Sequence, residues 1–297
     1  MRKALFAIAA TLIVTNTTIA QSPFYEGKTI TIVQGREPGD AGDMRVKAAL
    51  PFVQKYIPGN PTIVSEYMPG GGGRKAANHI YRTSKPDGLT LGNLGAGFIS
   101  SAIMGETGVQ YDIDRFVYLG TPYSAAHYLF ITNRERQLSN LEKLRAAPGV
   151  RIGAQSVGHT IYITGRLFAW LLGLKEPKFI TAYAGNESDI ALMRGELDGR
   201  SQAADWMLHR NREWFEKKLI DIHEILENPK GDKHKQITSV PELESSAKTD
   251  KEHKVLAMQR GLRGAGSPII LPTGVQKERN EILQVAMRKA LSDPEFA

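Results

Sequence analysis

Short β-branched apolar runs alternate with segments of helical periodicity along most of the chain. The runs predict strands, and the periodic segments between them predict helices. Strands are expected at Lys28–Gln34, Thr62–Glu66, Leu89–Leu94, Phe116–Thr121, Tyr128–Thr132, Val150–Gln155, Phe179–Tyr183 and Ser267–Pro272. Helices are expected at about Asp43–Tyr56, Lys75–Thr83, Ile161–Leu172 and Asp189–Arg194, and after Thr273, which is the expected cap of a C-terminal helix. This alternation predicts βαβ units and an α/β fold with mainly parallel sheets.

The segment His209–Lys254 breaks this alternation. It holds ten Lys or Arg and ten Asp or Glu residues, so it is highly charged but balanced. Such a composition is typical of solvated surface elements. We therefore expect surface helices and loops here, and no basic patch.

The first twenty residues have the pattern of a secretory leader. Arg2 and Lys3 precede an apolar run from Ala4 to Val14, and Thr18-Ile19-Ala20 gives a small-x-small cleavage site. The apolar run is too short to span a bilayer. An ordinary N-terminal helix and a membrane anchor remain the alternatives. The pattern favours export, with cleavage after Ala20.

Composition excludes several kinds of site. The chain has 297 residues, a formal charge of +7 and no Cys, which excludes disulfides, thiolate metal sites and a Cys nucleophile. The seven His residues show no metal-ligand spacing, and no cofactor motif is found. Removal of the leader lowers the charge to +5, and the remaining charges are interspersed. Nucleic-acid binding is therefore not expected.

Four glycine-containing loops each stand between an expected strand and an expected helix. They are Glu37–Asp43, Pro69–Lys75, Gln155–Thr160 and Tyr183–Ser188. Backbone N–H groups at such helix starts suit an anion. The dinucleotide, Walker A and nucleophile-elbow patterns all fail here. The alternative is a set of ordinary turns, with Asp40, Asp43, Ser156 or Thr160 as helix caps and His159 on the surface.

The order of these loops resembles a known family. The series runs through Pro38-Gly39, Ile57–Pro61, Met68–Gly73, Lys85–Gly92, Tyr111-Asp112, Gly158–Thr160, Tyr183–Asn186, Gly195–Asp198 and Asp293–Glu295. It is similar to the Bug-type extracytoplasmic solute receptors of tripartite tricarboxylate transporters, over essentially the whole mature chain. No single motif is decisive, but their order and spacing are specific.

The resemblance implies a two-lobed periplasmic binding protein of the type II-like "Venus flytrap" kind, with ligand in the cleft. It implies a first lobe of residues 21–124 and 260–297, a second lobe of residues 125–259, and a leader of residues 1–20. In open α/β sheets, ligands do bind beyond the carboxyl ends of strands. The expected ligand-binding residues are Gly39, Asp40, Ala41, Gly42, Asp43, Gly97, Phe98, Ser156, Gly158, His159, Thr160, Tyr183, Gly185, Asn186 and Asp205.

The sequence departs from the family pattern in two places. The first loop carries Glu37 and Asp40 where the family usually has Pro-Pro-Gly-Gly. These acids oppose a bound anion unless they point away, Arg74 and His159 compensate, or the ligand is not a simple dianion. The family also continues beyond Asp293-Pro294-Glu295 with further helix, so the chain is a candidate fragment.

The function implied is capture of a small organic carboxylate for a membrane transporter. The expected receptor is periplasmic and monomeric, needs no cofactor, and closes its lobes on the ligand before it docks on the transporter's membrane components. The alternative is a secreted α/β enzyme of hydrolase type that uses Ser156 or His159. The absence of a nucleophile motif favours the receptor.

Overall fold

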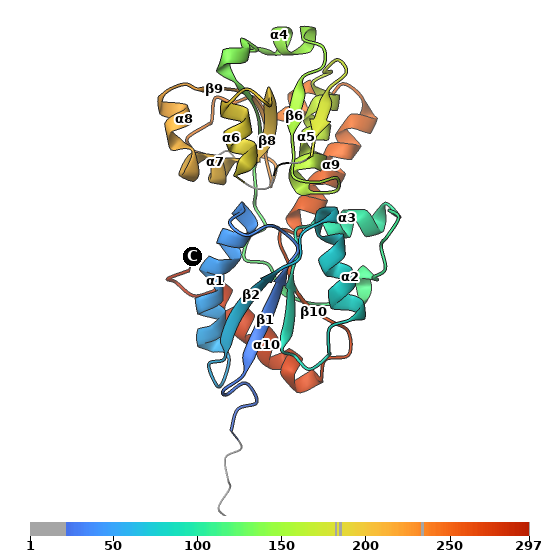
Figure 1. Cartoon of the computed structure of the whole chain (residues 1–297), viewed down its shortest axis with the longest axis vertical. Coiled ribbons are helices and arrows are strands. Elements are labelled where there is room, and N and C mark those ends of the chain that lie inside the picture. Colours follow the sequence, from blue (N-terminus) through green and yellow to red (C-terminus); the bar gives the residue numbers. More distant parts are fainter. Residues whose placement is uncertain (1–21, 182, 184–185, 233–234, 297) are drawn as a thin grey trace, which may run out of the picture.

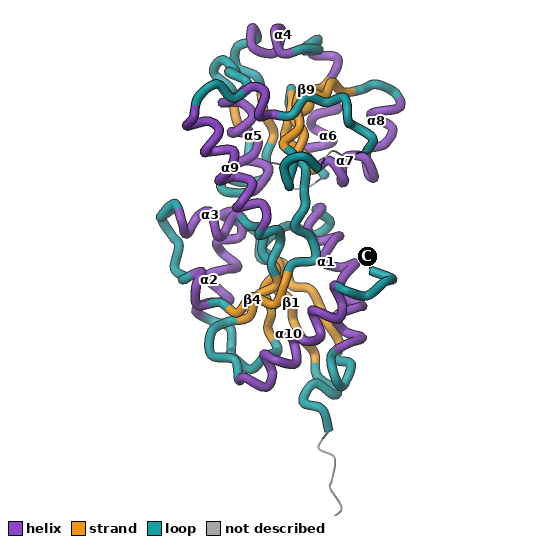
Figure 2. The backbone as a smooth tube through the Cα atoms, turned by 180° about the vertical axis from the view of Figure 1, so that it is seen from behind, coloured by secondary structure: helices purple, strands orange, loops and turns teal. Residues whose placement is uncertain are grey.

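The chain folds into two lobes, each built on its own five-stranded sheet (Figure 1). The computed structural model describes residues 22–296, except residues 182, 184–185 and 233–234. The expected leader therefore lies outside the described residues. Seen from behind, the two sheets are separate, and loops connect one lobe to the other (Figure 2).

The first lobe has the strand order β2-β1-β3-β10-β4. Its strands are β1 (Thr29–Gln34), β2 (Thr62–Tyr67), β3 (Thr90–Asn93), β4 (Val117–Gly120) and β10 (Ile269–Leu271). Its helices are α1 (Ala41–Tyr56), α2 (Arg74–Arg82), α3 (Gly97–Ile103) and α10 (Lys277–Leu291). Residues of α1 and α10 form one core with the sheet, and residues of α2 and α3 form a second core. Both faces of the sheet are therefore covered.

The second lobe has the strand order β7-β6-β8-β5-β9. Its strands are β5 (Tyr128–Asn133), β6 (Arg151–Gly153), β7 (Lys178–Ile180), β8 (Gly199–Ala203) and β9 (Ile220–Leu226). Its helices are α4 (Leu141–Ala146), α5 (Thr160–Leu171), α6 (Glu187–Met193), α7 (Ala204–Arg210), α8 (Arg212–Glu216) and α9 (Asp250–Gly264). Strand β5 is buried along its whole length. Because successive side chains point to opposite faces, Phe130 packs in the core with α5, while Leu129 and Ile131 pack in the core with α6 and α7.

Each sheet is mixed, and the antiparallel pairs involve the strands that the chain enters after crossing between lobes. Strands β1, β2 and β3 are parallel, as are β6, β7 and β8. Strand β10 runs antiparallel to β3 and β4, and β5 runs antiparallel to β8 and β9. The expected α/β, two-lobed fold class is confirmed. The parallel strands place the loops that follow β1 and β6 at the facing ends of the two sheets (Figure 1).

Two expectations differ from the structure. The charged segment His209–Lys254 contains the buried strand β9, because its polar side chains bond inside the lobe: His223 to Thr132 at 2.8 Å, for example. Gln276, rather than Thr273, stands at the cap position of α10.

The expected boundary between residues 259 and 260 falls inside helix α9. The lobe boundaries stay a prediction, but the second connection between the lobes is clear, since the chain passes from α9 into β10 of the first sheet. In the described part of the chain, every helix is too short or too polar to cross a lipid bilayer.

Replacing Glu224 with glutamine is expected to stabilise the protein at pH 8 and to leave it unchanged near pH 4. Burial raises the pKa of Glu224 to about 7, against the opposing hydrogen bond from Ser246. An acid whose folded pKa is raised stabilises the fold fully below its unfolded pKa, and this contribution is lost as the pH rises through the folded pKa. The difference between variant and wild type should grow between about pH 4.5 and 7, to about 3 kcal/mol at most.

Urea unfolding at pH 4.5, 6 and 8 measures this difference. Burial lowers the pKa of the neighbouring His223 to about 4, so His223 makes the unfolding free energy rise with pH, opposite to the effect of Glu224. This effect of His223 is common to both proteins and cancels in the difference between them. The exposed Glu142, replaced by glutamine, serves as the control and should show no such trend. A difference for Glu224→Gln that is independent of pH would contradict the prediction.

Candidate functional site

The loop after β1 is held by the acids at the start of α1. Asp40 is the N-cap of α1, and its Oδ1 accepts the Asp43 N–H at 2.8 Å. Asp43 is fully buried and accepts hydrogen bonds from the Gly39 N–H at 2.7 Å and from Gln34 at 2.7 Å, as well as from Lys47. Burial by itself raises the pKa of Asp43, but these hydrogen bonds outweigh it and lower the pKa. Asp43 therefore fixes the loop as a buried carboxylate.

Arg36 lies across the first turn of α1, in space that a glycine leaves open. A Cβ on Gly42 would stand 1.3 Å from Arg36 Nη1. Arg36 Nη2 donates to Ser267 Oγ at 2.6 Å, and the residue is 7% exposed. The guanidinium is thus packed between α1 and the segment that leads into β10.

The loop after β6 delivers His159 as a neutral hydrogen-bond donor. His159 is the N-cap of α5, and its Nδ1 accepts the Ile161 N–H at 3.2 Å, which leaves the ring proton on Nε2. Burial, followed by the charges of Arg36, Arg263 and Arg200, lowers the pKa of His159 to about 3. At neutral pH the imidazole is therefore uncharged among three guanidinium groups.

A cavity lies between the lobes where these loops meet. It has a volume of about 100 Å³, which is room for roughly eight water-sized groups. Its lining residues come from both lobes and from the connections between them: Gly35, Arg36, Asp40, Ala41, Gly42, Arg45, Gly72, Gly95, Tyr123, Ser124, Ala126, Tyr128, Gln155, His159, Thr160, Ile161, Arg200, Gln202, Ala203, Trp206, Arg263, Gly266 and Ser267. We call this cavity the inner cavity. A second, outer cavity of about 220 Å³ adjoins it, and Arg36, Gly72 and His159 are among the residues that line both.

Two of the four arginines that line the inner cavity are paired with acids. Arg200, 1% exposed, donates to Asp189 at 2.6 Å within the second lobe. Arg45 of α1 binds Asp205 of α7, so this ion pair joins the lobes. The Arg45 guanidinium also lies 3.8 Å from the centre of the Tyr123 ring, in the first connection between the lobes.

The other two arginines bond to hydroxyl groups instead. Arg263, 4% exposed, donates to Thr160 Oγ1 at the start of α5. Its Nε and Nη2, and the Nε of Arg36, have no hydrogen-bond partner among the described residues. Buried donors of this kind are costly to leave unpaired. Both residues line the cavity, so their guanidinium groups place positive charge beside it, which favours an anion there.

Backbone atoms of the two lobes touch beside this cavity. A Cβ on Gly72, in the turn before α2, would stand 2.4 Å from the carbonyl oxygen of Gly158. A Cβ on Gly97 would stand 2.6 Å from the same oxygen. Glycine at these positions therefore permits the closed arrangement of the lobes.

The structure brings seven of the expected site residues to the two cavities. Asp40, Ala41, Gly42, His159 and Thr160 line the inner cavity, while Ser156 and Tyr183, like His159, line the outer one. Among the described residues, those that line neither cavity are Gly39, Asp43, Gly97, Phe98, Gly158, Asn186 and Asp205. Gly185 lies outside the described residues.

Several of the non-lining residues have structural contacts. The ring of Phe98 is fully buried against Tyr111 and Phe116 in the first lobe, so it points into the core and away from the cleft. Gly97 and Gly158 contribute to the lobe contact, and Asp205 binds Arg45. A direct ligand contact of these residues stays a prediction.

The arginines were missed by sequence reasoning. Arg74, expected to compensate for the acids of the first loop, binds Glu106 instead. Arg36, Arg45, Arg200 and Arg263 are the cations at the cavity. No strand was expected at Gly199–Ala203, so the burial of Arg200 was not predicted from the sequence.

The site has the character of an anion receptor. No group of three or more potential metal ligands occurs in the described part of the chain. Guanidinium groups, a neutral imidazole N–H and two helix starts all favour oxygens that carry negative charge.

Comparison with known proteins supports this architecture. No family model and no curated protein matches the sequence. Among solved structures, the periplasmic binding protein BugD matches with a TM-score of 0.72 at 16% identity, over 92% of this chain and 85% of BugD. MatC from Rhodopseudomonas palustris, with bound malate, gives 0.69 at 17% identity, over 91% and 86% of the two chains. An R. palustris protein with adipate gives 0.66 at 14% identity, over 88% and 82%.

These similarities show the fold. The two-lobed α/β architecture is that of Bug-type and related periplasmic binding proteins, as the resemblance in the sequence implied. The likeness extends over most of both chains, so it includes both lobes and the connections between them.

Proposed function

We propose that this protein is a periplasmic receptor that binds a small organic carboxylate between its lobes and delivers it to a tripartite tricarboxylate-type membrane transporter. The observation that carries the proposal is the cavity between the lobes, where Arg36 and Arg263 are buried with unfilled donors. Neighbours of the same fold hold malate and adipate.

Lobe closure is the mechanism that suits this arrangement. The cavity walls come from both lobes, so a ligand that contacts both favours the closed form over the open one. The closed form presents a surface that the open form lacks, and the transporter's membrane components are the proposed partner of that surface. A monomer suffices for this role, and the leader pattern in the sequence supports a periplasmic location.

The receptor role agrees better with His159 than a hydrolase role does. A general base must accept a proton, but Nδ1 of His159 already accepts the Ile161 N–H, and its low pKa makes the ring a weak base. Ser156 lines only the outer cavity. These features suit ligand binding and do not provide an activated nucleophile.

A thermal-shift screen of mono-, di- and tricarboxylates and aromatic acids tests the proposal. A ligand that binds only the native state stabilises it by RT ln(1 + [L]/Kd), so the melting temperature rises with the ligand's concentration and affinity. We expect one group of small carboxylates to raise it, with calorimetry giving a one-to-one complex. Failure of every carboxylate to bind, or hydrolysis of carboxylic esters that is lost in Ser156→Ala, would overturn the proposal.

A further inference from the structure

Arg36 and Arg263 are each tied to their own side of the cleft by a hydroxyl group. Arg36 donates to Ser267, which leads into a strand of the first sheet. Arg263 donates to Thr160, the first residue of α5 in the second lobe. Both charges are close enough to His159 to lower its pKa. Both guanidinium groups line the cavity between the lobes.

Neither arginine has an acid as its hydrogen-bond partner among the described residues. Arg200 and Arg45, the other cavity arginines, each bind an aspartate. The charges of Asp40 and Asp43 act on Arg36, but Asp40 Oδ1 caps α1 and Asp43 is bound within the loop. Burial of a charged group that lacks a partner is costly. In the closed cleft the two arginines have this free-energy cost as long as no anion is bound beside them.

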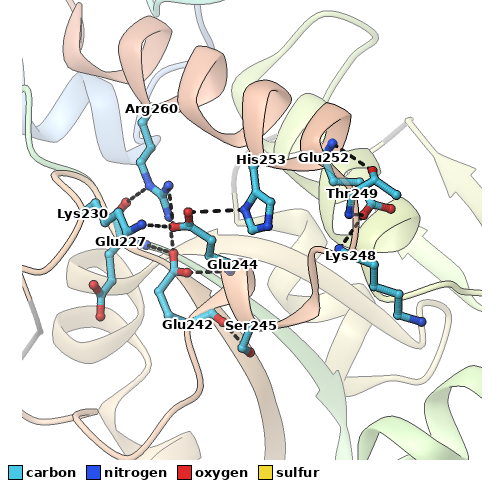
Figure 3. Close-up of polar contacts among 10 residues, drawn as sticks. All are labelled: Glu227, Lys230, Glu242, Glu244, Ser245, Lys248, Thr249, Glu252, His253 and Arg260. Carbon is cyan, nitrogen blue, oxygen red and sulfur yellow. Dashed lines mark hydrogen bonds and ion pairs between the residues drawn. The ribbon is translucent and has the colours of Figure 1, made fainter.

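Helix α9 holds Arg263 in position. Arg260, about one turn earlier on α9, donates to the Glu227 carbonyl at 3.0 Å and to Glu244 at 3.1 Å, and it also binds Glu242 (Figure 3). These contacts fasten α9 to the second lobe close to its end. Just beyond Arg263 the chain turns at Gly266 and enters the first lobe. Arg263 thus stands at the end of a fixed helix, next to the connection between the lobes.

We propose that Arg36 and Arg263 form a split anion clamp that makes lobe closure depend on the negative charge of the ligand. The inference rests on the proposed function, since it concerns the same cavity. Without an anion, the two guanidinium groups oppose closure. A ligand whose negatively charged oxygens lie beside both arginines removes this opposition, whereas an uncharged ligand of the same shape does not.

The test is Arg263→Gln, because glutamine keeps a donor for Thr160 but removes the charge. Small-angle scattering of the ligand-free variant should show a protein more compact than ligand-free wild type. Adipate and sulfate should compact the wild type and leave the variant unchanged, and the dissociation constant for adipate should rise at least about tenfold. Adipamide, the neutral diamide of the same length, should compact neither protein.

Two further variants make the result specific. Arg36→Gln should behave like Arg263→Gln, because it removes the other half of the clamp. Arg212→Gln is the matched control, since Arg212 is an exposed arginine of the same lobe as α9, and it should behave like wild type. A merely structural role for Arg263 predicts loss of melting temperature with no compaction of the ligand-free protein, and that result would overturn the clamp.

The outcomes also separate the clamp from the proposed function. If no organic carboxylate binds, but sulfate compacts the wild type and not Arg263→Gln, the clamp stands and the carboxylate receptor fails. If carboxylates bind wild type and both clamp variants equally well, the receptor stands and the clamp fails. Compaction of the wild type by adipamide as strongly as by adipate likewise rejects the clamp.

Discussion

Replacing Gly72 with alanine is expected to hold the two lobes apart and to weaken ligand binding by at least about tenfold, or about 1.4 kcal/mol. The added Cβ would lie 2.4 Å from the carbonyl carbon and oxygen of Gly158 and 2.9 Å from the His159 nitrogen. These are backbone atoms of the opposite lobe, so no side-chain rotation relieves the overlap. Calorimetry with the ligand from the screen measures the affinity, and scattering measures the loss of ligand-induced compaction.

Gly105 provides a matched control for this experiment. Gly72 has φ of 63° and Gly105 has φ of 62°, so alanine carries a similar backbone strain at both positions. A Cβ on Gly105 meets nothing within 4 Å. Gly105→Ala should therefore lower the melting temperature about as much as Gly72→Ala while it leaves the affinity intact. Equal affinities for the two variants would show that the lobe contact is not part of the ligand-bound state.

Replacing Arg200 with leucine is expected to cause the largest loss of stability, about 3–5 kcal/mol in the unfolding free energy of the ligand-free protein. Arg200 is 1% exposed, and its Nη1 donates to Asp189 at 2.6 Å. Among the described residues, the variant leaves the buried Asp189 carboxylate with one side-chain donor, the Asn211 amide, at 3.2 Å. Chemical unfolding followed by circular dichroism measures the change.

A change at Asp189, the other residue of this ion pair, shows whether its unpaired carboxylate causes the loss of stability. Adding Asp189→Asn to Arg200→Leu removes that charge, and the double variant should recover more than half of the lost stability. Arg212→Leu breaks the exposed pair with Glu216 and should change stability little. If the double variant is no more stable than Arg200→Leu, lost packing is the cause and the ion pair is not.

Local patterns predicted most of the fold. The alternation in Lys28–Gln34 and the continuous apolar run at Tyr128–Thr132 each predicted a strand, and both strands were found, each next to an edge strand of its sheet. Strand β9 escaped because its apolar residues are interrupted by Asp221, His223 and Glu224, which read as solvated. These three side chains can be buried only because residues of other strands and turns provide their polar partners.

The candidate site was predicted less completely, for a related reason. Glycines and capping residues predict a loop at the start of a helix, so the loops at Asp40 and His159 were predicted correctly. What the arginines do depends on contacts between distant segments: Arg36 reaches Ser267, and Arg263 reaches Thr160. The glycine run before α2 read as a flexible turn, because nothing local reveals that Gly72 touches Gly158 of the other lobe.

Strand β10 has a consequence for the order of folding. It lies between β3 and β4 and is the strand that joins them, yet it is formed by Ile269–Leu271, more than 140 residues after β4. The sheet of the second lobe already has all its strands at Leu226. As the chain emerges in order from its N-terminus, the second lobe is therefore able to complete its sheet first. The N-terminal lobe, although synthesised earlier, has to keep its half-built sheet free of wrong strand partners until the last part of the chain arrives.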